Sequence, residues 1–305
     1  MAAGEGTMVT RRAKHSKLTT DYEGYFLILP NVVIYVAFIF LPALGTVALS
    51  FTDFNIFAMS FVGLSNFIAL LEDALFLRSV VNTFYYAAGT IIPSMAIGLL
   101  IAVVLNNPVR WRGVFRLVIF LPHVLSVVAV SLAWLYLYNP SAGVFNIILG
   151  RLGLPRFDWL RDPNMAMPSI IAMQIWNGLG YNMVVFLAGL QTIPKELYEV
   201  AQIDGASRFR QFFRITLPML SPTTFFLFVT GVIFSFQVFG QVYIMTAGGP
   251  LNRTTTIVHQ VYYRGFEGYQ MGYASAMAVF LVVLTAVVTI INIRASRGRS
   301  ATSGF

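Results

Sequence analysis

Two apolar stretches of this sequence each contain a small group of uncharged hydrogen-bonding residues. In the first, Gln174, Asn177 and Tyr181 stand at positions i, i+3 and i+7, with Gly178 leaving space beside them, so one helix face would carry all three side chains. The second group is Ser235, Gln237 and Gln241, with Phe234 and Phe236 nearby. Amides and hydroxyls can bind a neutral, hydroxyl-rich ligand, and aromatic rings can pack on sugar rings. The same polar side chains can instead hold membrane helices together.

No residues are grouped in a way that indicates covalent chemistry. The sequence has no cysteine, which excludes disulfides, thiol chemistry and cysteine metal sites. The three histidines, His15, His123 and His259, are too far apart in the sequence to suggest a metal site. No lysine belongs to a phosphate-binding G-x-x-x-x-G-K-[ST] loop, and no serine elbow or carboxylate pair is present. We therefore expect no catalytic residue, metal or cofactor on this chain.

Long uncharged runs dominate the sequence, in which 57% of the 305 residues are hydrophobic and 10% are charged. A transmembrane helix needs ~20 apolar residues, and six runs are longer than that. None has the alternating pattern of a barrel strand. The sequence predicts an all-α membrane protein with six transmembrane helices, near residues 25–50, 80–105, 115–138, 168–190, 219–245 and 270–293.

Lysine and arginine are distributed unevenly between the two sides of such a bundle. Fourteen of the 20 lie in the tails and in the loops after the second and fourth spans. Because cytoplasmic segments carry the excess of basic residues, both termini are expected in the cytoplasm. The predicted organisation is a cytoplasmic tail (1–24), a six-helix membrane domain (25–293) and a second cytoplasmic tail (294–305). This topology and contact with anionic lipid headgroups account for the net charge of +8 without a nucleic-acid partner.

The absence of charge inside these runs bears on the class of membrane protein. Ion-coupled carriers usually keep Asp, Glu, Lys or Arg within their helices as proton relays or ion ligands. The six uncharged runs contain none of these residues. The sequence therefore disfavours an ion-coupled secondary carrier without excluding it.

The loop after the fourth span, residues 195–217, is unusually charged and amphipathic. Pro194 suits the first turn of a short helix, and Thr192 is a plausible N-cap for it. Gly205 can take a positive φ and end that helix. Ser207 can then cap a second short helix, on which Phe209, Phe212 and Phe213 share a face.

This pattern predicts a cytoplasmic hairpin of two short helices joined at a glycine. Its apolar face could lie on the inner leaflet of the membrane. It could equally dock on a cytoplasmic partner protein.

The hairpin also contains a motif of defined spacing, which combines Glu199, Val200, Ala201, Gly205, Ile215, Leu217 and Pro218. This spacing resembles the EAA loop in the permease subunits of binding-protein-dependent ABC importers, with Val200 replacing the first alanine. The stretches FVGLSNF, TAGGPLNRTTT and MGYASAMAVFL resemble the maltose and glycerol-3-phosphate branch of that family. The similarity runs from about Tyr25 to Ile293.

The resemblance implies a type I ABC importer permease in a bacterial cytoplasmic membrane. It implies that the hairpin is a coupling helix seated on an ATPase, and that the ATPase-coupling residues are Glu199, Ala201, Asp204, Gly205, Ile215, Leu217 and Pro218. The implied partners are a second homologous permease, two ATPase subunits that bind ATP and Mg, and an extracytoplasmic solute-binding protein.

The resemblance also implies where the cargo passes. In the similar maltose permease the sugar contacts lie on the fourth and fifth spans of the six-span core, at positions that match Gln174, Gly178 and Tyr181 and at or beside Ser235 and Gln237. A sugar or oligosaccharide is therefore the expected cargo. Glycerol 3-phosphate or a related phosphodiester is the alternative within the family. An ion-coupled carrier and a scaffold or receptor without solute flux are the alternatives outside it.

Overall fold

The computed structural model describes residues 20–55 and 57–302 and divides the chain into two units, Met1–Ala48 and Leu49–Phe305. Helices make up most of the described chain, in agreement with the predicted all-α class, and loops connect them. The described residues also form a two-stranded antiparallel sheet of β1 (Thr52–Phe54) and β2 (Met59–Phe61), in which Asp53 pairs with Ser60. This short sheet was not predicted.

The first unit holds the first predicted span. It comprises α1 (Thr20–Tyr35), a π-helical turn η1 (Val36–Phe40) and most of α2 (Leu41–Leu49). The stretch Tyr25–Leu49 is long and apolar enough to cross a membrane, and none of its side chains is buried. Such a surface is stable only in contact with lipid or with another apolar surface.

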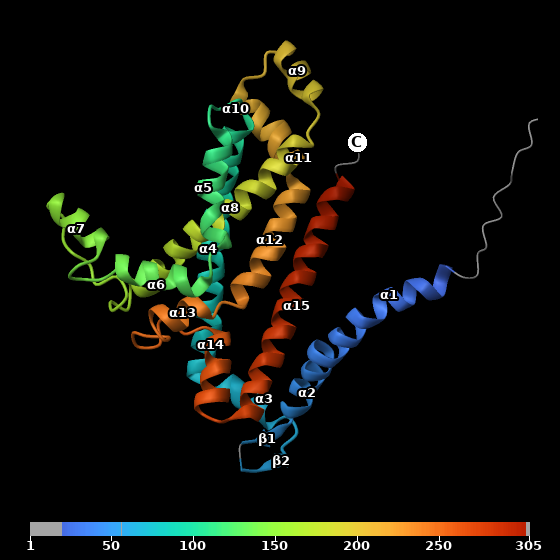
Figure 1. Cartoon of the computed structure of the whole chain (residues 1–305), viewed down its shortest axis with the longest axis vertical. Coiled ribbons are helices and arrows are strands. Elements are labelled where there is room, and N and C mark those ends of the chain that lie inside the picture. Colours follow the sequence, from blue (N-terminus) through green and yellow to red (C-terminus); the bar gives the residue numbers. More distant parts are fainter. Residues whose placement is uncertain (1–19, 56, 303–305) are drawn as a thin grey trace, which may run out of the picture. The chain divides into compact units, whose positions relative to one another are not determined.

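The second unit contains the remaining helices (Figure 1). They are α3 (Ser65–Glu72), α4 (Ala74–Asn106), α5 (Arg112–Val124), α6 (Val127–Leu137), α7 (Val144–Arg151), α8 (Ala166–Gln191), α9 (Lys195–Ile203), α10 (Arg208–Gln211), η2 (Phe212–Thr216), α11 (Leu217–Met219), α12 (Ser221–Phe236), α13 (Gly240–Met245), α14 (Ile257–Tyr262), η3 (Tyr263–Glu267) and α15 (Met271–Thr302).

The packing of α4 against α8 forms the centre of this unit. Glycines allow the close approach, because a Cβ added at Gly98 would lie 2.7 Å from the Cβ of Asn182. Small residues at helix contacts are the usual solution where lipid supplies no hydrophobic driving force. Met183 and Phe186 on α8 are buried in the resulting core, to which α12 adds Leu227.

The third predicted span is not one helix. Residues 115–138 divide into α5 and α6, whose axes differ by 99°. Pro122 lies in the last turn of α5, and the Ser126 hydroxyl accepts a hydrogen bond from Val128 N (3.3 Å) and so caps α6. Proline and an N-cap side by side favour a helix stop followed by a new start.

The fifth predicted span, 219–245, is also interrupted. Its helix α12 ends at Phe236, and α13 begins only at Gly240. At the other end, the helix that contains Pro218 runs from Arg208 to Met219 and bends by 62° before α12.

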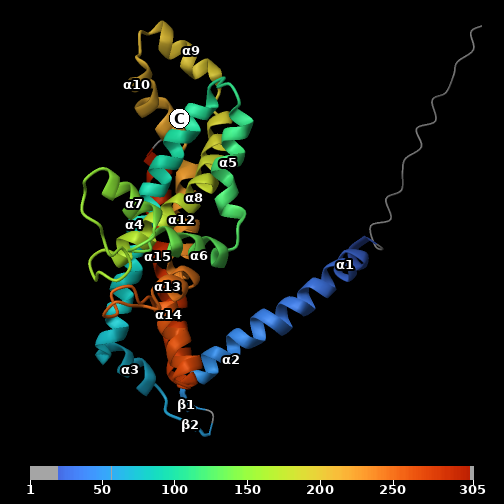
Figure 2. The same ribbon diagram turned by 60° about the vertical axis from the view of Figure 1, so that its left-hand side comes forward.

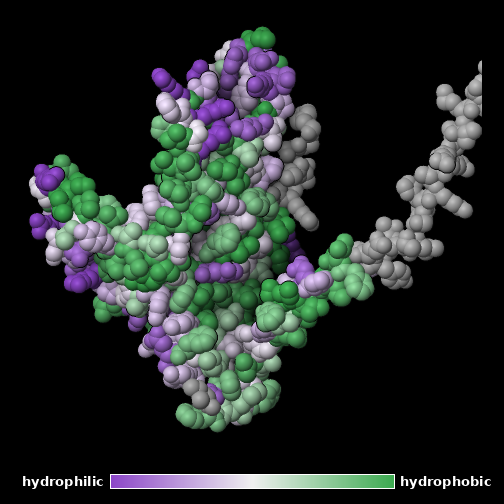
Figure 3. Space-filling model, viewed as in Figure 1, coloured by the Kyte–Doolittle hydropathy of each residue, from purple (hydrophilic) through white to green (hydrophobic). Residues whose placement is uncertain are grey.

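Four helices of the described chain are thus long and apolar enough to cross a membrane, and the number becomes six if each bent pair is one span. The β1–β2 sheet with α3 lies at one end of the second unit, and α9 with α10 lies at the other (Figure 2). Hydrophilic side chains gather at the α9–α10 end, whereas apolar side chains cover the flanks of the adjoining helices (Figure 3).

The end that carries α3 is tied together by Asp73, the N-cap of α4. One carboxylate oxygen accepts hydrogen bonds from Leu75 N (2.8 Å) and Phe76 N (3.1 Å). The other accepts from Arg264 Nη2 (3.1 Å) and Tyr273 Oη (3.0 Å), which belong to η3 and α15. A single carboxylate therefore fixes three elements from distant parts of the sequence.

Candidate functional site: a central cavity and a helical hairpin

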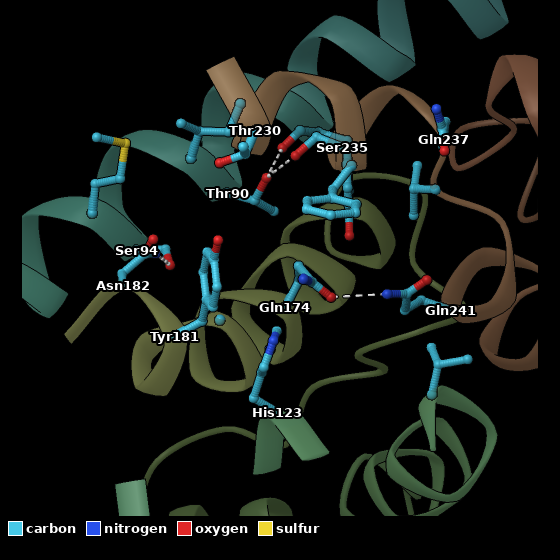
Figure 4. Close-up of a pocket in the computed structure, with 18 of the residues that line it drawn as sticks. Thr90, Ser94, His123, Gln174, Tyr181, Asn182, Thr230, Ser235, Gln237 and Gln241 are labelled. Atoms are coloured by element: carbon cyan, nitrogen blue, oxygen red, sulfur yellow. Dashed lines mark hydrogen bonds between the residues drawn. The ribbon is translucent and has the colours of Figure 1, made fainter. Parts of the chain in front are cut away.

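A cavity of about 560 Å³ lies among α4, α5, α8, α12 and α13 (Figure 4). Its polar lining consists of Thr90, Ser94, His123, Gln174, Tyr181, Asn182, Thr230, Ser235, Gln237 and Gln241. Apolar and aromatic side chains, including Phe234 and Phe239, complete the wall. A concave, mainly apolar pocket with a few convergent polar groups is the usual form of a small-molecule site.

Hydrogen bonds across the cavity wall orient several of these groups. Gln241 Nε2 donates to Gln174 Oε1 at 2.8 Å, and the hydroxyls of Thr90 and Ser235 lie 3.3 Å apart. Each pair joins two different helices. Because their partners hold these side chains in place, the cavity presents a set of preorganised donors and acceptors.

The cavity wall contains one imidazole, that of His123, and no carboxylate, ammonium or guanidinium group among the described residues. The ring of His123 stacks on the ring of Tyr181 with centroids 5.1 Å apart, as Figure 4 shows. Such a lining matches uncharged hydroxyl groups better than it matches a strongly charged ligand.

Six of the seven residues predicted for the substrate pathway line this one cavity; they are Gln174, Gly178, Tyr181, Ser235, Gln237 and Gln241. The seventh, Asn177, does not line it. Its Nδ2 donates instead to the backbone oxygen of Pro122 (2.9 Å) and so joins α8 to α5. On α8, Gln174 thus faces the cavity, whereas Asn177 holds two helices together.

Sequence reasoning missed several polar lining residues. Thr90 and Ser94 lie one turn apart on α4 and face Ser235 and Asn182, respectively; Asn182 Nδ2 donates to Ser94 Oγ at 2.5 Å. Their i, i+4 spacing within an apolar run was a usable signal. The spacing does not show that α4, rather than another helix, packs beside α8.

At the far end of the second unit, α9 and α10 form the predicted hairpin. Gly205 has φ +75° and ends α9. Ala206 N donates to Ala201 O (2.8 Å) and Gly205 N to Gln202 O (3.0 Å), which is the hydrogen-bond pattern of a Schellman C-cap. Ser207 caps α10 by accepting from Arg210 N (3.4 Å), as predicted.

The start of α9 differs from the prediction. Thr192 is not its N-cap; it ends α8, and its hydroxyl donates to Gly189 O (2.8 Å). Pro194 occupies the position immediately before α9 rather than lying within its first turn. The hydroxyl bonds backward because the chain is still helical at Thr192, where such a bond to a preceding carbonyl is readily made.

Contacts between the two arms close the hairpin. The hydroxyls of Tyr198 on α9 and Thr216 on η2 lie 2.9 Å apart. On the second arm, the rings of Phe209 and Phe213 lie 4.7 Å apart. The hairpin is therefore an ordered structure with its own internal contacts.

Much of the apolar surface of the hairpin is nevertheless open. Ile203 is 86% exposed and Phe209 is 75% exposed. The predicted coupling residues lie on both arms: Glu199, Ala201, Asp204 and Gly205 on α9 and its turn, and Ile215, Leu217 and Pro218 at the base of the second arm. An ordered hairpin with exposed apolar side chains provides a surface for docking.

Comparison with known proteins gives consistent results over most of the chain. Residues 83–298 match the family described as "Binding-protein-dependent transport system inner membrane component". The sn-glycerol-3-phosphate transport system permease protein UgpA of Agrobacterium fabrum (strain C58 / ATCC 33970) is 37% identical over 273 residues, which cover 88% of this chain and 93% of the relative. The probable ABC transporter permease protein YurN of Bacillus subtilis (strain 168) is 33% identical over 275 residues, covering 88% and 94%.

Solved structures show the same fold. A chain in the crystal structure of a bacterial alginate ABC transporter in complex with an alginate pentasaccharide-bound periplasmic protein superimposes with a TM-score of 0.83. It is 27% identical, and the match covers 93% of this chain and 97% of that chain. This chain therefore belongs to the family of binding-protein-dependent transport system inner membrane components and has the ABC importer type I permease fold.

Proposed function

We propose that this permease subunit carries a sugar or oligosaccharide through the central cavity. The observation that carries the proposal is the lining of the cavity, in which amides, hydroxyls, aromatic rings and the imidazole of His123 surround a space that no described Asp, Glu, Lys or Arg lines. Neutral donors and acceptors replace the water that hydrates sugar hydroxyls, and aromatic rings take the apolar faces of sugar rings. The alginate importer, whose cargo is an acidic polysaccharide, supports transport of a saccharide by this fold.

A second cargo is favoured by the relatives named as sn-glycerol-3-phosphate permeases. Glycerol 3-phosphate also has hydroxyls, but its phosphate carries negative charge, which is costly to bury without a partner. Only the imidazole of His123 could carry a compensating positive charge among the described lining residues. We therefore place carbohydrate first and glycerol 3-phosphate second.

The hairpin is proposed to couple transport to ATP hydrolysis on separate subunits. In this proposal the open apolar side chains of α9 and α10 seat on an ATPase, and ATP with Mg is bound there rather than by this chain. Two ATPases, a second six-span permease and an extracytoplasmic solute-binding protein complete the assembly. Its two states would open the cavity alternately to the two sides of the membrane, with the populations set by the partners.

Six membrane spans with both termini in the cytoplasm fit this scheme. Each bent pair, α5 with α6 and α10–α11 with α12, then counts as one span. The hairpin falls on the cytoplasmic side, where an ATPase can reach it, and the segment between α13 and α15 falls on the side of the solute-binding protein. Arg208, Arg210 and Arg214 on the hairpin agree with the positive-inside rule.

The test is purification of the chain from its native membrane, followed by an ATPase assay in proteoliposomes. We expect recovery with an ATPase and a second permease. With the co-encoded binding protein, we expect stimulation of ATP hydrolysis by one of a panel of sugars, such as maltohexaose, cellohexaose or xylohexaose. Stimulation by glycerol 3-phosphate alone would contradict the carbohydrate proposal. Recovery of an active carrier without any ATPase would contradict the ABC assignment of the assembly.

A further inference from the structure

Four aromatic residues form a continuous group that starts in the cavity wall, in which the rings of Phe239, Tyr243 and Tyr262 each contact the other two and Phe266 extends the group from Tyr262. Phe239 lines the cavity, and its ring is stacked on that of Tyr243 with centroids 5.2 Å apart. The Phe239 ring also lies 5.0 Å from Tyr262, and Tyr262 is stacked on Phe266 at 5.6 Å. We call Phe239, Tyr243, Tyr262 and Phe266 the aromatic row.

Helical spacing produces the row from two separate segments. Phe239 and Tyr243 are four positions apart at the start of α13, and Tyr262 and Phe266 are four positions apart in α14 and η3. Residues at i and i+4 lie above one another on a helix, so each segment supplies a pair of neighbouring rings. The Tyr243 and Tyr262 rings, 5.2 Å apart, join the pairs.

Buried hydrogen bonds hold the two segments in register. Thr256, directly before α14, donates from its hydroxyl to Val238 O (3.0 Å), directly before Phe239. Ile257 N donates to Thr83 Oγ1 (3.1 Å), which fixes α14 to α4. Thr256, Ile257 and Thr83 are all fully buried. The rings are therefore held in place before any ligand arrives, which lowers the entropic cost of binding.

The rings remain accessible although their backbone is fixed. Tyr243 is 40% exposed and Phe266 is 62% exposed, while Phe239 and Tyr262 are half-buried. Two of the four have hydroxyl groups, and Gln237 and Gln241, two positions before and after Phe239 in the sequence, line the same cavity. Flat apolar faces beside hydrogen-bonding groups are what a sugar ring requires, since it is apolar on its faces and polar at its rim.

We propose that the aromatic row is a carbohydrate-binding path that receives successive sugar rings and leads them into the central cavity. The inference rests on the proposed carbohydrate function and extends it to residues outside the cavity. The continuity of the row with the cavity through Phe239 identifies the cargo as its occupant. A lipid or a second permease would need apolar area at this surface but not flat ring faces.

A substitution that keeps the apolar volume of a side chain but removes its flat ring distinguishes a sugar from a lipid or a second permease as the occupant of this surface. We would compare Tyr262→Leu and Phe266→Leu with Tyr262→Phe, which retains the ring. Tyr263→Leu is the matched control, because Tyr263 is the adjacent residue, is 47% exposed and makes none of the contacts of the row. Each variant would be purified with the complete transporter and reconstituted in proteoliposomes with the binding protein.

The measurement is the initial rate of uptake at saturating loaded binding protein, with the hexasaccharide that stimulates the wild-type ATPase and with the matching monosaccharide. We expect roughly tenfold slower hexasaccharide uptake for Tyr262→Leu and Phe266→Leu, a smaller change for the monosaccharide, and near wild-type rates for Tyr262→Phe and Tyr263→Leu. Equal uptake by Tyr262→Leu and Tyr263→Leu would overturn the proposed carbohydrate-binding path but would leave the proposed carbohydrate function standing. Loss of the second permease from the Tyr262→Leu complex would show a packing surface instead. A wild-type transporter that responds to glycerol 3-phosphate and to no sugar would overturn both proposals.

Discussion

Gln174 and Asn177 are separated by less than one turn of α8, yet the structure gives them different surroundings. Gln174 lines the cavity and pairs with Gln241, whereas Asn177 bonds to Pro122 O. We predict that Gln174→Leu slows uptake about tenfold at saturating loaded binding protein, because a side-chain amide is lost from the path and Gln241 Nε2 loses its partner. The purified complex should unfold at nearly the wild-type temperature, because Gln241 lines the cavity and water there can replace the lost acceptor.

Asn177→Leu is the matched comparison on the same helix. It removes the bond between α8 and α5 and leaves the Pro122 carbonyl without that donor, so we expect a loss of about 1 to 2 kcal/mol in stability. Uptake per correctly folded complex should stay close to wild type. Thermal unfolding and uptake, measured on both variants, would contradict this division of roles if the two substitutions had the same effects.

Residue types and spacing predicted some of the residues that line the cavity and missed others. Gln174 and Tyr181 stand out because they lie seven positions apart, on one helix face with Asn177 between them. Thr90 and Ser94 give only the weaker signal of their i, i+4 spacing, and Thr230 gives none, because a threonine or serine in a membrane helix usually bonds to its own preceding turn, as the Thr230 hydroxyl does with Phe226 O. Only the packing of α4 and α12 around α8 shows that these three residues also face the cavity.

At the scale of elements, the contact between α4, η3 and α15 depends on one charged group. Burial tends to raise the pKa of the Asp73 carboxyl, but hydrogen bonds from Phe76 N, Tyr273 Oη and Leu75 N and the charge of Arg264 outweigh it and lower the pKa below its ordinary value of 3.8. A lowered pKa in the folded state means that the carboxylate stabilises the fold above pH 3.8 and loses this effect as the pH falls through the folded-state pKa.

We predict that Asp73→Asn lowers the free energy of unfolding by about 1 to 2 kcal/mol at neutral pH, because Arg264 and Tyr273 lose a charged acceptor. The cost should shrink as the pH falls through the lowered pKa of Asp73, where the wild-type carboxyl also becomes protonated. Thermal unfolding of the purified protein in detergent at several pH values measures this. Glu72→Gln, at an exposed neighbouring carboxyl, should leave the profile unchanged; a cost for Asp73→Asn that does not vary with pH would contradict the role of its charge.

The turn of the hairpin depends on backbone conformation rather than on space. A Cβ at Gly205 would meet nothing within 4 Å, but its φ of +75° disfavours every β-branched residue. We predict that Gly205→Val strains or rebuilds the turn at a local cost of ~1 to 2 kcal/mol and abolishes uptake, while membrane insertion is unchanged. Gly205→Asn, which tolerates this conformation better, should retain part of the activity.

Gly113→Ala serves as the control for that substitution. Gly113 lies in α5, also has open space around it, and has no positive φ. Uptake by this variant should be unchanged. Normal uptake by Gly205→Val would show that the turn does not transmit the ATPase motion.

Hydropathy predicted where apolar helices occur and could not predict where they bend. The helix α4 contains Pro93 and still runs unbroken from Ala74 to Asn106, whereas the chain near Pro122 turns by 99°. Both prolines lie in uncharged, apolar surroundings in the sequence. The difference is that Ser126 caps a new helix after Pro122, and that Gly180 on α8 allows the backbone at Ile119 and Phe120 to pack closely beside it. That contact joins residues about 60 positions apart, so a local pattern does not contain it.

At the scale of the whole molecule, orientation in the membrane gives the two ends of the second unit their proposed partners. The hairpin must face the ATP-containing side, and the aromatic row must face the side where the binding protein delivers its cargo. Ile203 in the hairpin and Leu251 between α13 and α14 are 86% and 74% exposed, so both sites can be reached by a reagent from their own side.

The lack of cysteine makes this orientation directly measurable, because a single introduced thiol is the only one in the chain. We predict that Leu251→Cys reacts with a membrane-impermeant maleimide in intact spheroplasts, and that Ile203→Cys reacts only after the membrane is permeabilised. A cysteine placed in either predicted cytoplasmic tail, 1–24 or 294–305, should behave as Ile203→Cys does. Labelling of Ile203→Cys in intact spheroplasts would invert the topology and remove the hairpin from the reach of any ATPase. Labelling of one tail but not the other would require an odd number of spans, so that one bent pair would not cross the membrane.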